Sequence, residues 1–299
     1  MPKYDYLILS PHFDDAVLSC SARILAASRQ KKKILVATVF SETSNAPDDL
    51  EKSRQRKDED DKAMSFVGAD SVWLGFADAP WRSPHYSSFS RIIGQPAASD
   101  FEFQQEVGRR IANLWQEVQP ETTLLPLAVG EHIDHRIVYQ ARHALPPYCN
   151  LEFYEDRPYV FPKGMLELRL TAIAGSDEDR DLRRFRELLS NLSAVHIYKS
   201  GRAALTYGWL LAMARRIRKP PVDAPLLEPR LIKFEEADLQ MVLNAMSFYD
   251  SQIKGLFGTL AEYEEECRAY AALLSEAAYA ERYWIRIHTR RQAFDIIKR

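Results

Sequence analysis

The stretch LILSPHFDDAVLSCSA (residues 7–22) passes from an apolar run through a histidine and two adjacent carboxylates into a second apolar run. Charged groups between two segments that look buried cost free energy unless they cap a helix, pair with partners or hold a metal. Residues 4–10 are rich in β-formers, and Pro11 favours an extended conformation for the residue before it. Residues 16–29 then carry apolar side chains at helical spacing. We therefore predict a strand, a polar loop and a helix.

The same alternation of strand and helix continues along the first half of the chain. Further strands are predicted at 34–40, 71–74, 122–127 and 151–154, and helices at 51–67, 101–118 and 136–144. Residues 75–100 are rich in Pro, Ser and Gly and are predicted to form a long loop at the rim of a binding site. This pattern predicts an α/β fold with a mostly parallel sheet flanked by helices.

The pattern changes after residue 155. Helices are predicted at 177–191 and 203–218, followed by a breaker run at 219–229 and more helices from about 235 to 283. We divide the chain into a core at residues 1–160 and a C-terminal part at 161–299. The C-terminal part is expected partly to complete the core and partly to form a helix-rich extension.

Composition narrows the class of protein. The chain has 299 residues, of which 46% are apolar, and a formal net charge of -2. This balance supports a full hydrophobic core and argues against a nucleic-acid groove. The three cysteines are odd in number and far apart, which predicts reduced, buried thiols. No stretch is long and apolar enough for a membrane span or a signal peptide, so a soluble, cytoplasmic protein is expected.

A second polar loop, AVGEHIDHR (residues 128–136), follows the strand at 122–127. Ligands of such sheets bind beyond the carboxyl ends of the strands, so the two loops can meet in space. His12 and Asp15 can reach one divalent cation, and the second loop offers a third ligand from His132, Asp134 or His135. Two histidines, one carboxylate and a water are typical of catalytic zinc and also suit Fe(II).

The remaining polar residues of the two loops allow a division of roles. Asp14 can face the attacking water as general base, because Asp15 suffices for the metal. His132 can stabilise an oxyanion, with Asp134 holding its tautomer. The structural alternative is that Asp14 or Asp15 only caps the following helix. The acidic run at 58–61 is interpreted as a solvated helix face. The chain contains no nucleophile elbow, dinucleotide fingerprint or Walker A loop.

The segments SPHFDDAVLSC (10–20) and GEHIDHR (130–136) resemble the two signatures of the PIG-L/LmbE-like zinc-dependent N-acetylglucosaminyl deacetylases, with Phe13 and Ile133 where prolines are usual. The resemblance continues through the spacing of Arg56, Glu59, Ala63 and Gly68 and through LGFAD (74–78). It implies a Rossmann-like fold with zinc bound by His12, Asp15 and His135. It also implies Asp14 as base, a role for His132 at the carbonyl or the leaving amine, and sugar binding by Arg56 and Asp78.

The sequence therefore predicts a hydrolase of linear amides that removes an N-acyl group, expected to be acetyl, from an amino sugar or its conjugate. Zn²⁺ is the expected cofactor and Fe²⁺ the alternative. The expected partner is this small molecule, and the C-terminal half could also mediate homo-oligomers. Two alternatives stay open. One is a deacylase of a non-sugar N-acyl substrate in secondary metabolism, which aromatic residues of the 75–100 loop would suit. The other is a metal-dependent binding protein without turnover.

Overall fold

The computed structural model describes residues 4–43, 46–93, 97–162, 164–174 and 226–287. At its centre lies a seven-stranded sheet in the order β3-β2-β1-β4-β5-β7-β6. The strands are β1 (Tyr6–Ser10), β2 (Ile34–Glu42), β3 (Asp70–Ala77), β4 (Thr122–Pro126), β5 (Leu151–Tyr154), β6 (Leu226–Phe234) and β7 (Tyr279–Ile287). The first five strands run parallel, and β7 and β6 continue the sheet as an antiparallel pair. The predicted α/β fold with a mostly parallel sheet is confirmed.

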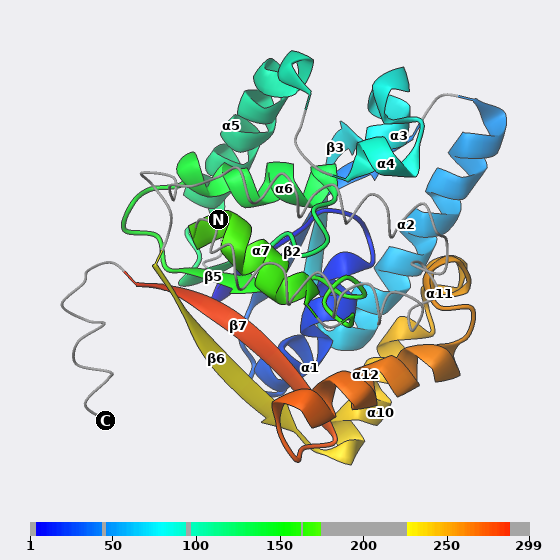
Figure 1. Cartoon of the computed structure of the whole chain (residues 1–299), viewed down its shortest axis with the longest axis vertical. Helices are drawn as coiled ribbons and strands as arrows, with labels where there is room; N and C mark the ends of the chain where they lie inside the picture. The colour runs from blue at the N-terminus through cyan, green and yellow to red at the C-terminus, as the bar shows by residue number, and fades with distance from the viewer. Residues whose placement is uncertain (1–3, 44–45, 94–96, 163, 175–225, 288–299) are drawn as a thin grey trace.

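Helices flank the sheet (Figure 1). The longer ones are α1 (Asp15–Arg29), α2 (Pro47–Val67), α5 (Phe101–Val118), α6 (Ile133–Gln140), α7 (Met165–Ala174), α10 (Glu236–Met246), α11 (Asp250–Leu256) and α12 (Leu260–Leu274). The segment predicted as a long loop instead contains short helical pieces, namely α3 (Ala79–Arg82), η1 (Pro84–Tyr86), α4 (Phe89–Ile92) and η2 (Ala98–Asp100). A further turn, η3 (Ala141–His143), extends α6.

The prediction for the C-terminal part was wrong in two places. Residues 226–229, predicted as the end of the breaker run at 219–229, belong to strand β6, and residues 279–283, predicted as the end of the helical region, belong to strand β7. Pro229 is tolerated in β6 because β6 lies at the edge of the sheet, where one row of backbone groups needs no partner. In β7 the alternate residues Tyr279, Glu281 and Tyr283 are buried, as expected for a strand packed on one face. The helices predicted at 177–191 and 203–218 lie outside the described residues.

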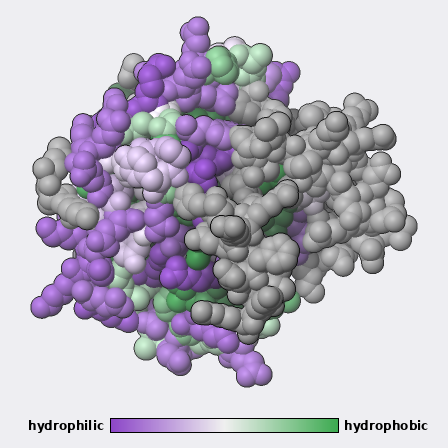
Figure 2. Space-filling view, turned by 90° about the vertical axis from the view of Figure 1, so that its left-hand side faces the viewer, coloured by the Kyte–Doolittle hydropathy of each residue, from purple (hydrophilic) through white to green (hydrophobic). Residues whose placement is uncertain are grey.

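The sheet is continuous across the predicted boundary at residue 160, because β5 pairs with β7. The C-terminal helices also pack onto the core, with α10 against α1 and α2. Cys20, Cys149 and Cys267 are free and buried, as predicted. No helix among the described residues is long and apolar enough to cross a membrane. On the face seen in Figure 2, the described surface is mainly hydrophilic.

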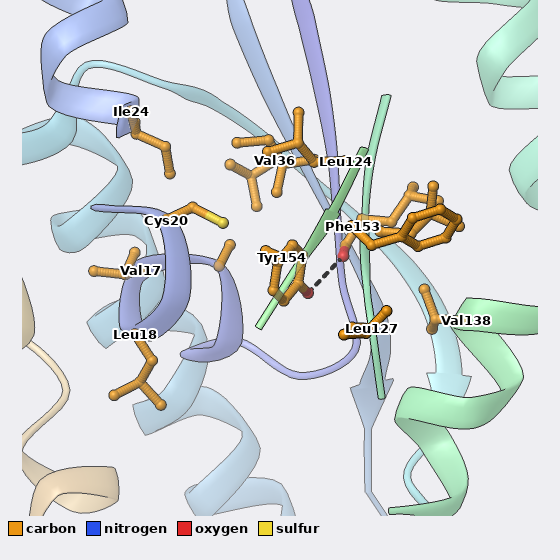
Figure 3. Close-up of a cluster of buried hydrophobic side chains, with 14 of the residues drawn as sticks. Val17, Leu18, Cys20, Ile24, Val36, Leu124, Leu127, Val138, Phe153 and Tyr154 are labelled. Atoms are coloured by element: carbon orange, nitrogen blue, oxygen red, sulfur yellow. Dashed lines mark hydrogen bonds between the residues drawn. The ribbon is translucent and has the colours of Figure 1, made fainter. Parts of the chain in front are cut away.

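The core around β1 holds the first polar loop in place. Central strands β1 and β2 are almost wholly buried, as expected for parallel strands covered on both faces. Figure 3 shows Cys20 of α1 pointing towards Tyr154 of β5, and the Tyr154 hydroxyl donates a 2.9 Å hydrogen bond to the Leu9 carbonyl oxygen. This bond ties the end of β1 to β5, so the loop that follows β1 starts from a fixed point.

Candidate metal and substrate site

The first polar loop lies between β1 and α1, and its serine caps the helix. Ser10 Oγ accepts a 3.0 Å hydrogen bond from the backbone N–H of Ala16, while the Asp14 side chain makes no capping bond. Asp15 Oδ2 accepts the backbone N–H of His12 at 2.8 Å. Since Ser10 satisfies the helix terminus, the carboxylate of Asp14 is left for another purpose. The capping alternative for Asp14 is thereby removed.

Two histidine nitrogens converge on one oxygen of Asp15. His12 Nδ1 lies 3.1 Å and His135 Nε2 lies 3.3 Å from Asp15 Oδ2. Donors that each bind one cation at about 2.1 Å with a tetrahedral angle lie about 3.4 Å apart, so this spacing fits a shared metal ion. His135 Nε2 is buried and has no hydrogen-bond partner among the described residues. Such an orphaned buried nitrogen costs free energy unless a ligand binds it.

A second set of possible donors overlaps the first. Donor atoms of His12, His132 and Asp134 lie within 4.8 Å of one another, as do those of His12, Asp15 and His135. The carboxylate of Asp134, however, already accepts hydrogen bonds from the Ala79 N–H at 2.9 Å and from Arg82 Nη1 at 2.8 Å. The set that contains His135 is therefore the better fit for a metal, and its two imidazoles and one carboxylate are a donor set typical of zinc.

Buried partners orient both histidines of this set. His135 Nδ1 lies 2.6 Å from Asp156 Oδ1, and His12 Nε2 lies 3.3 Å from Asp134 Oδ2. Such contacts fix the proton on the nitrogen that faces the carboxylate and leave the other nitrogen as a metal donor. Asp156 was not predicted as a site residue. Its segment YEDRPY (154–159) resembles a stretch found in some members of the family. That resemblance assigned no role to Asp156, because the role depends on where β5 ends relative to α6.

His132 has a different environment from the one expected. Its Nδ1 accepts a 3.2 Å hydrogen bond from the backbone N–H of Asp134, whereas the Asp134 carboxylate points to Ala79, Arg82 and His12. Because Nδ1 accepts, the ring proton of neutral His132 resides on Nε2. Burial, together with the charge of His12, lowers the pKa of His132 to about 3. His132 is thus a neutral hydrogen-bond donor at ordinary pH.

Carboxylates crowd the site and shift one another's protonation. Burial and the neighbouring charge of Asp15 raise the pKa of Asp14 to about 6. Burial also opposes ionisation of Asp15, but His135 and His12 outweigh it and hold the pKa of Asp15 well below its usual range. Burial lowers the pKa of His135, yet Asp15 and Asp156 raise it to about 9. The raised pKa values of Asp14 and His135 reflect negative charge concentrated at a buried site, which a divalent cation would balance.

These residues border a cavity of about 220 Å³. Arg56 and Asp78, predicted as substrate-binding, both line it, and Arg56 Nη1 lies 3.9 Å from Asp78 Oδ2. The structure thus brings every predicted site residue to one place, with Asp134 and His135 just behind the lining. The full lining is His12, Asp14, Asp15, Arg56, Asp78, Pro80, Trp81, His132, Pro158, Tyr159, Gln252 and Leu256.

Tyr159 reaches the cavity through a close backbone approach. Gly130 has a φ of +85°, and a Cβ there would lie 2.6 Å from atoms of the Tyr159 side chain. Only glycine accommodates both the left-handed conformation and this contact. The Tyr159 ring packs edge-on against His135, with 5.4 Å between ring centroids. Tyr159, Gln252 and Leu256 were not predicted as site residues. The segments YEDRPY (154–159) and YDSQ (249–252) resemble stretches of some family members, but that resemblance gave their residues no role.

The acidic run of α2 is only partly a solvated face. Asp58 and Asp61 are exposed, but Glu59 and Asp60 are buried. Glu59 accepts hydrogen bonds from the backbone N–H and the hydroxyl of Ser251, and Asp60 accepts one from the Tyr249 hydroxyl. The interpretation of residues 58–61 as a solvated face was therefore wrong for these two residues, which dock α11 onto α2.

Comparison with known proteins relates part of this chain to one family. Residues 7–145 match the PIG-L family (GlcNAc-PI de-N-acetylase). A 2′-N-acetylparomamine deacetylase from Streptomyces fradiae is 33% identical over 175 residues, which are 55% of this chain and 61% of that protein. The chain thus aligns with less than two thirds of this relative.

Two solved structures share the fold across nearly the whole chain. The A40926 pseudoaglycone deacetylase has a TM-score of 0.61 at 20% identity, covering 96% of this chain and 98% of that one. The zinc-inhibited form of a teicoplanin deacetylase has a TM-score of 0.65 at 18% identity, covering 95% and 98%. The resemblance of the two polar loops to the PIG-L signatures is confirmed by the family match, which spans residues 7–145.

Proposed function

We propose that this chain is a metal-dependent deacetylase that hydrolyses the N-acetyl group of an amino sugar or its conjugate. The observation that carries the proposal is the orphaned Nε2 of His135, which lies 3.3 Å from Asp15 Oδ2, behind a cavity lined by Asp14, Asp15 and His132. Metal donors, a base and a hydrogen-bond donor in one cavity are the parts that amide hydrolysis needs.

His12 Nδ1, Asp15 Oδ2 and His135 Nε2 would hold the cation, with Zn²⁺ expected and Fe²⁺ as the alternative. When bound, a divalent cation lowers the pKa of a water molecule and polarises a carbonyl oxygen. Asp134 and Asp156 keep the two imidazoles in the required tautomers. The donor set contains no thiolate, which suits a hydrolytic site better than a structural one.

Asp14 is assigned as the general base. Its pKa of about 6 leaves it largely ionised near neutral pH and still basic enough to accept a proton from the attacking water. As the water oxygen bonds to the amide carbon, the carbonyl oxygen gains negative charge, and the Nε2–H of His132 donates to it. Because His132 is neutral, the proton required by the departing amine comes back from Asp14. The C–N bond then breaks to give acetate and the free amine.

The remaining lining residues suit a polar ring. Arg56 offers hydrogen-bond donors and Asp78 offers acceptors on one wall, and Trp81 provides a flat apolar surface on which a sugar can stack. The relatives named above are deacetylases of 2′-N-acetylparomamine and of the A40926 pseudoaglycone. The first of these names supports an amino-sugar substrate for this chain as well. The three free, buried cysteines suit a reducing compartment such as the cytoplasm.

The proposal is tested by acetate release from the zinc-loaded protein. The substrates are 2′-N-acetylparomamine, N-acetylglucosamine and an N-acetylated aromatic amino acid. We expect acetate from at least one amino sugar, loss of activity with a chelator and recovery on adding Zn²⁺. Activity only on the amino acid would favour the non-sugar deacylase. Metal binding with no acetate from any amide would leave a binding protein and refute the proposal.

A further inference from the structure

One wall of the cavity comes from a part of the chain that lies outside the family match. Gln252 and Leu256 both belong to α11, about 240 residues after His12 in sequence. They face the same cavity as the metal donors and Arg56. The segment at 7–145 that matches the PIG-L family therefore supplies the metal donors and Asp14, while α11 adds two further side chains to the lining.

The docking of α11 is specific. Tyr249 donates from its hydroxyl to Asp60 Oδ1 at 2.8 Å, and Ser251 donates from its backbone N–H and its hydroxyl to Glu59 at 3.1 and 2.7 Å. Both acceptors are buried residues of α2, the helix that also carries Arg56 one turn earlier. Figure 1 shows α11 lying next to α2. The hydrogen bonds that Glu59 and Asp60 accept from Ser251 and Tyr249 thus set the position of α11, and with it Gln252, relative to Arg56.

The orientation of the Gln252 amide follows from the donors and acceptors beside it. The Ser251 hydroxyl has one proton, and it is used in the bond to Glu59 Oε2. The atom of Gln252 that lies 2.9 Å from Ser251 Oγ must therefore be the donor, Nε2. This leaves Oε1 as the free end of the amide, and it accepts no hydrogen bond from the described residues. A fixed, neutral acceptor is consequently presented at a cavity wall.

We propose that Gln252 is a specificity-determining residue, whose Oε1 accepts a hydrogen bond from a hydroxyl or amine donor on the substrate, away from the acetyl group. The inference rests on the proposed deacetylase function. Ser251 acts as a positioning residue, because its hydroxyl holds the amide and removes rotamer freedom before the substrate arrives. A polar group prepared in this way discriminates against analogues that lack its partner, since the acceptor then stays unpaired.

The inference is tested with Gln252→Met, which keeps the length of the side chain and removes the amide. Acetate release is measured for an N-acetylglucosaminide and for analogues that each lack one hydroxyl. One of these analogues should lack the hydroxyl that Gln252 binds. For the wild-type protein, kcat/KM should be about three- to tenfold lower on that analogue than on the complete substrate. On the complete substrate, kcat/KM of Gln252→Met should be lower than that of the wild-type protein by the same factor. The variant should not distinguish the complete substrate from that analogue. Ser251→Ala is expected to weaken the same discrimination.

Gln240→Met is the matched control, because Gln240 is exposed on α10 and donates to Glu236 at the surface. It should leave kcat/KM and the discrimination unchanged. If Gln252→Met lowers kcat/KM by one factor for every analogue, or lowers it for none, Gln252 reads no substrate group and the inference is wrong while the deacetylase function stands. If wild-type protein releases no acetate from any amino sugar, the proposed function fails and the inference fails with it.

Discussion

Asp156 Oδ1 lies 2.6 Å from His135 Nδ1, and both side chains are almost completely shielded from solvent. The other oxygen of Asp156 accepts the backbone N–H of Val129 at 2.9 Å. One oxygen of the Asp156 carboxylate is therefore held by the Val129 backbone while the other orients the His135 imidazole on α6. Histidine ligands of metals commonly depend on such a partner for the tautomer and direction of the ring.

Asp156→Asn should weaken metal binding while the protein remains folded. An asparagine has only one acceptor oxygen, so it cannot serve both His135 and Val129, and it carries no charge to favour a bound cation. We expect the dissociation constant for Zn²⁺ to rise about 10- to 100-fold, measured by competition with a chromogenic chelator. Asp58→Asn, on the exposed face of α2, is the control. Equal affinities for the two variants would contradict this role of Asp156.

Asp14→Asn should nearly abolish turnover and leave metal binding intact. The amide cannot accept a proton from water, so we expect kcat to fall by about 10²- to 10⁴-fold. The measurement pairs acetate release with metal content of the purified protein. Loss of the metal together with activity would instead indicate that Asp14 is a ligand, and wild-type turnover would exclude it as the base.

Metal affinity should rise with pH up to about 9. The pKa values of His12 and His135 lie above the ordinary value in the metal-free protein, because carboxylates oppose and outweigh the effect of burial. A cation must displace protons from both rings, and this costs more at lower pH. Calorimetry in buffers of different ionisation enthalpy should show proton release on binding Zn²⁺ at pH 7. Binding without proton release would contradict these protonation states.

Asp60→Asn should change the pH dependence of stability. Burial raises the pKa of Asp60 to about 6 despite hydrogen bonds from Trp73 and Tyr249. The native state therefore binds the proton more tightly than the unfolded chain, whose aspartates titrate near pH 4. The contribution of Asp60 to stability is full below that pH and is lost as the pH rises through about 6.

In urea unfolding, the stability of Asp60→Asn relative to wild type should improve from pH 4 to pH 7 by up to about 3 kcal/mol. Groups that titrate equally in both proteins cancel in this difference. A pH-independent difference between the two proteins would show that Asp60 is not protonated more readily in the native state. Asp61→Asn, on the exposed side of the same helix, should follow the wild-type profile.

The first half of the fold could be predicted because its strands and helices carry local patterns. Parallel strands such as β2 are buried on both faces and show as continuous apolar runs. Strands β6 and β7 could not be found in this way. They pair with each other across about 50 intervening residues, and β7 reaches back to β5 across more than 120. Nothing local to Ala280–Arg282 distinguishes a strand from the continuation of α12.

In the candidate site, too, residues with a local sequence pattern could be predicted and residues that depend on distant partners could not. His12, Asp14 and Asp15 adjoin one another in sequence, as do His132, Asp134 and His135, so their chemistry is visible before folding. Asp156, Arg82 and Gln252 each act through a partner that only the tertiary structure supplies. The same holds for Glu59 and Asp60. Their charges predicted a solvent-exposed helix face, but in the structure the segment that contains Tyr249 and Ser251 packs over both carboxylates.

Helix α2 connects two parts of the cavity lining. It carries Arg56 towards the substrate and, three and four residues later, the carboxylates that hold α11 and Gln252. Because an α-helix rises about 1.5 Å and turns about 100° per residue, α2 fixes the position of Arg56 relative to the two carboxylates that hold α11. A single residue inserted between Arg56 and Glu59 would rotate Arg56 by about 100° around the helix axis relative to Glu59 and Asp60, so Arg56 and Gln252 would no longer face the same cavity. The space between Arg56 and Gln252 therefore depends on the helical register of α2, so a change in the length of this helix would alter the cavity without touching either lining residue.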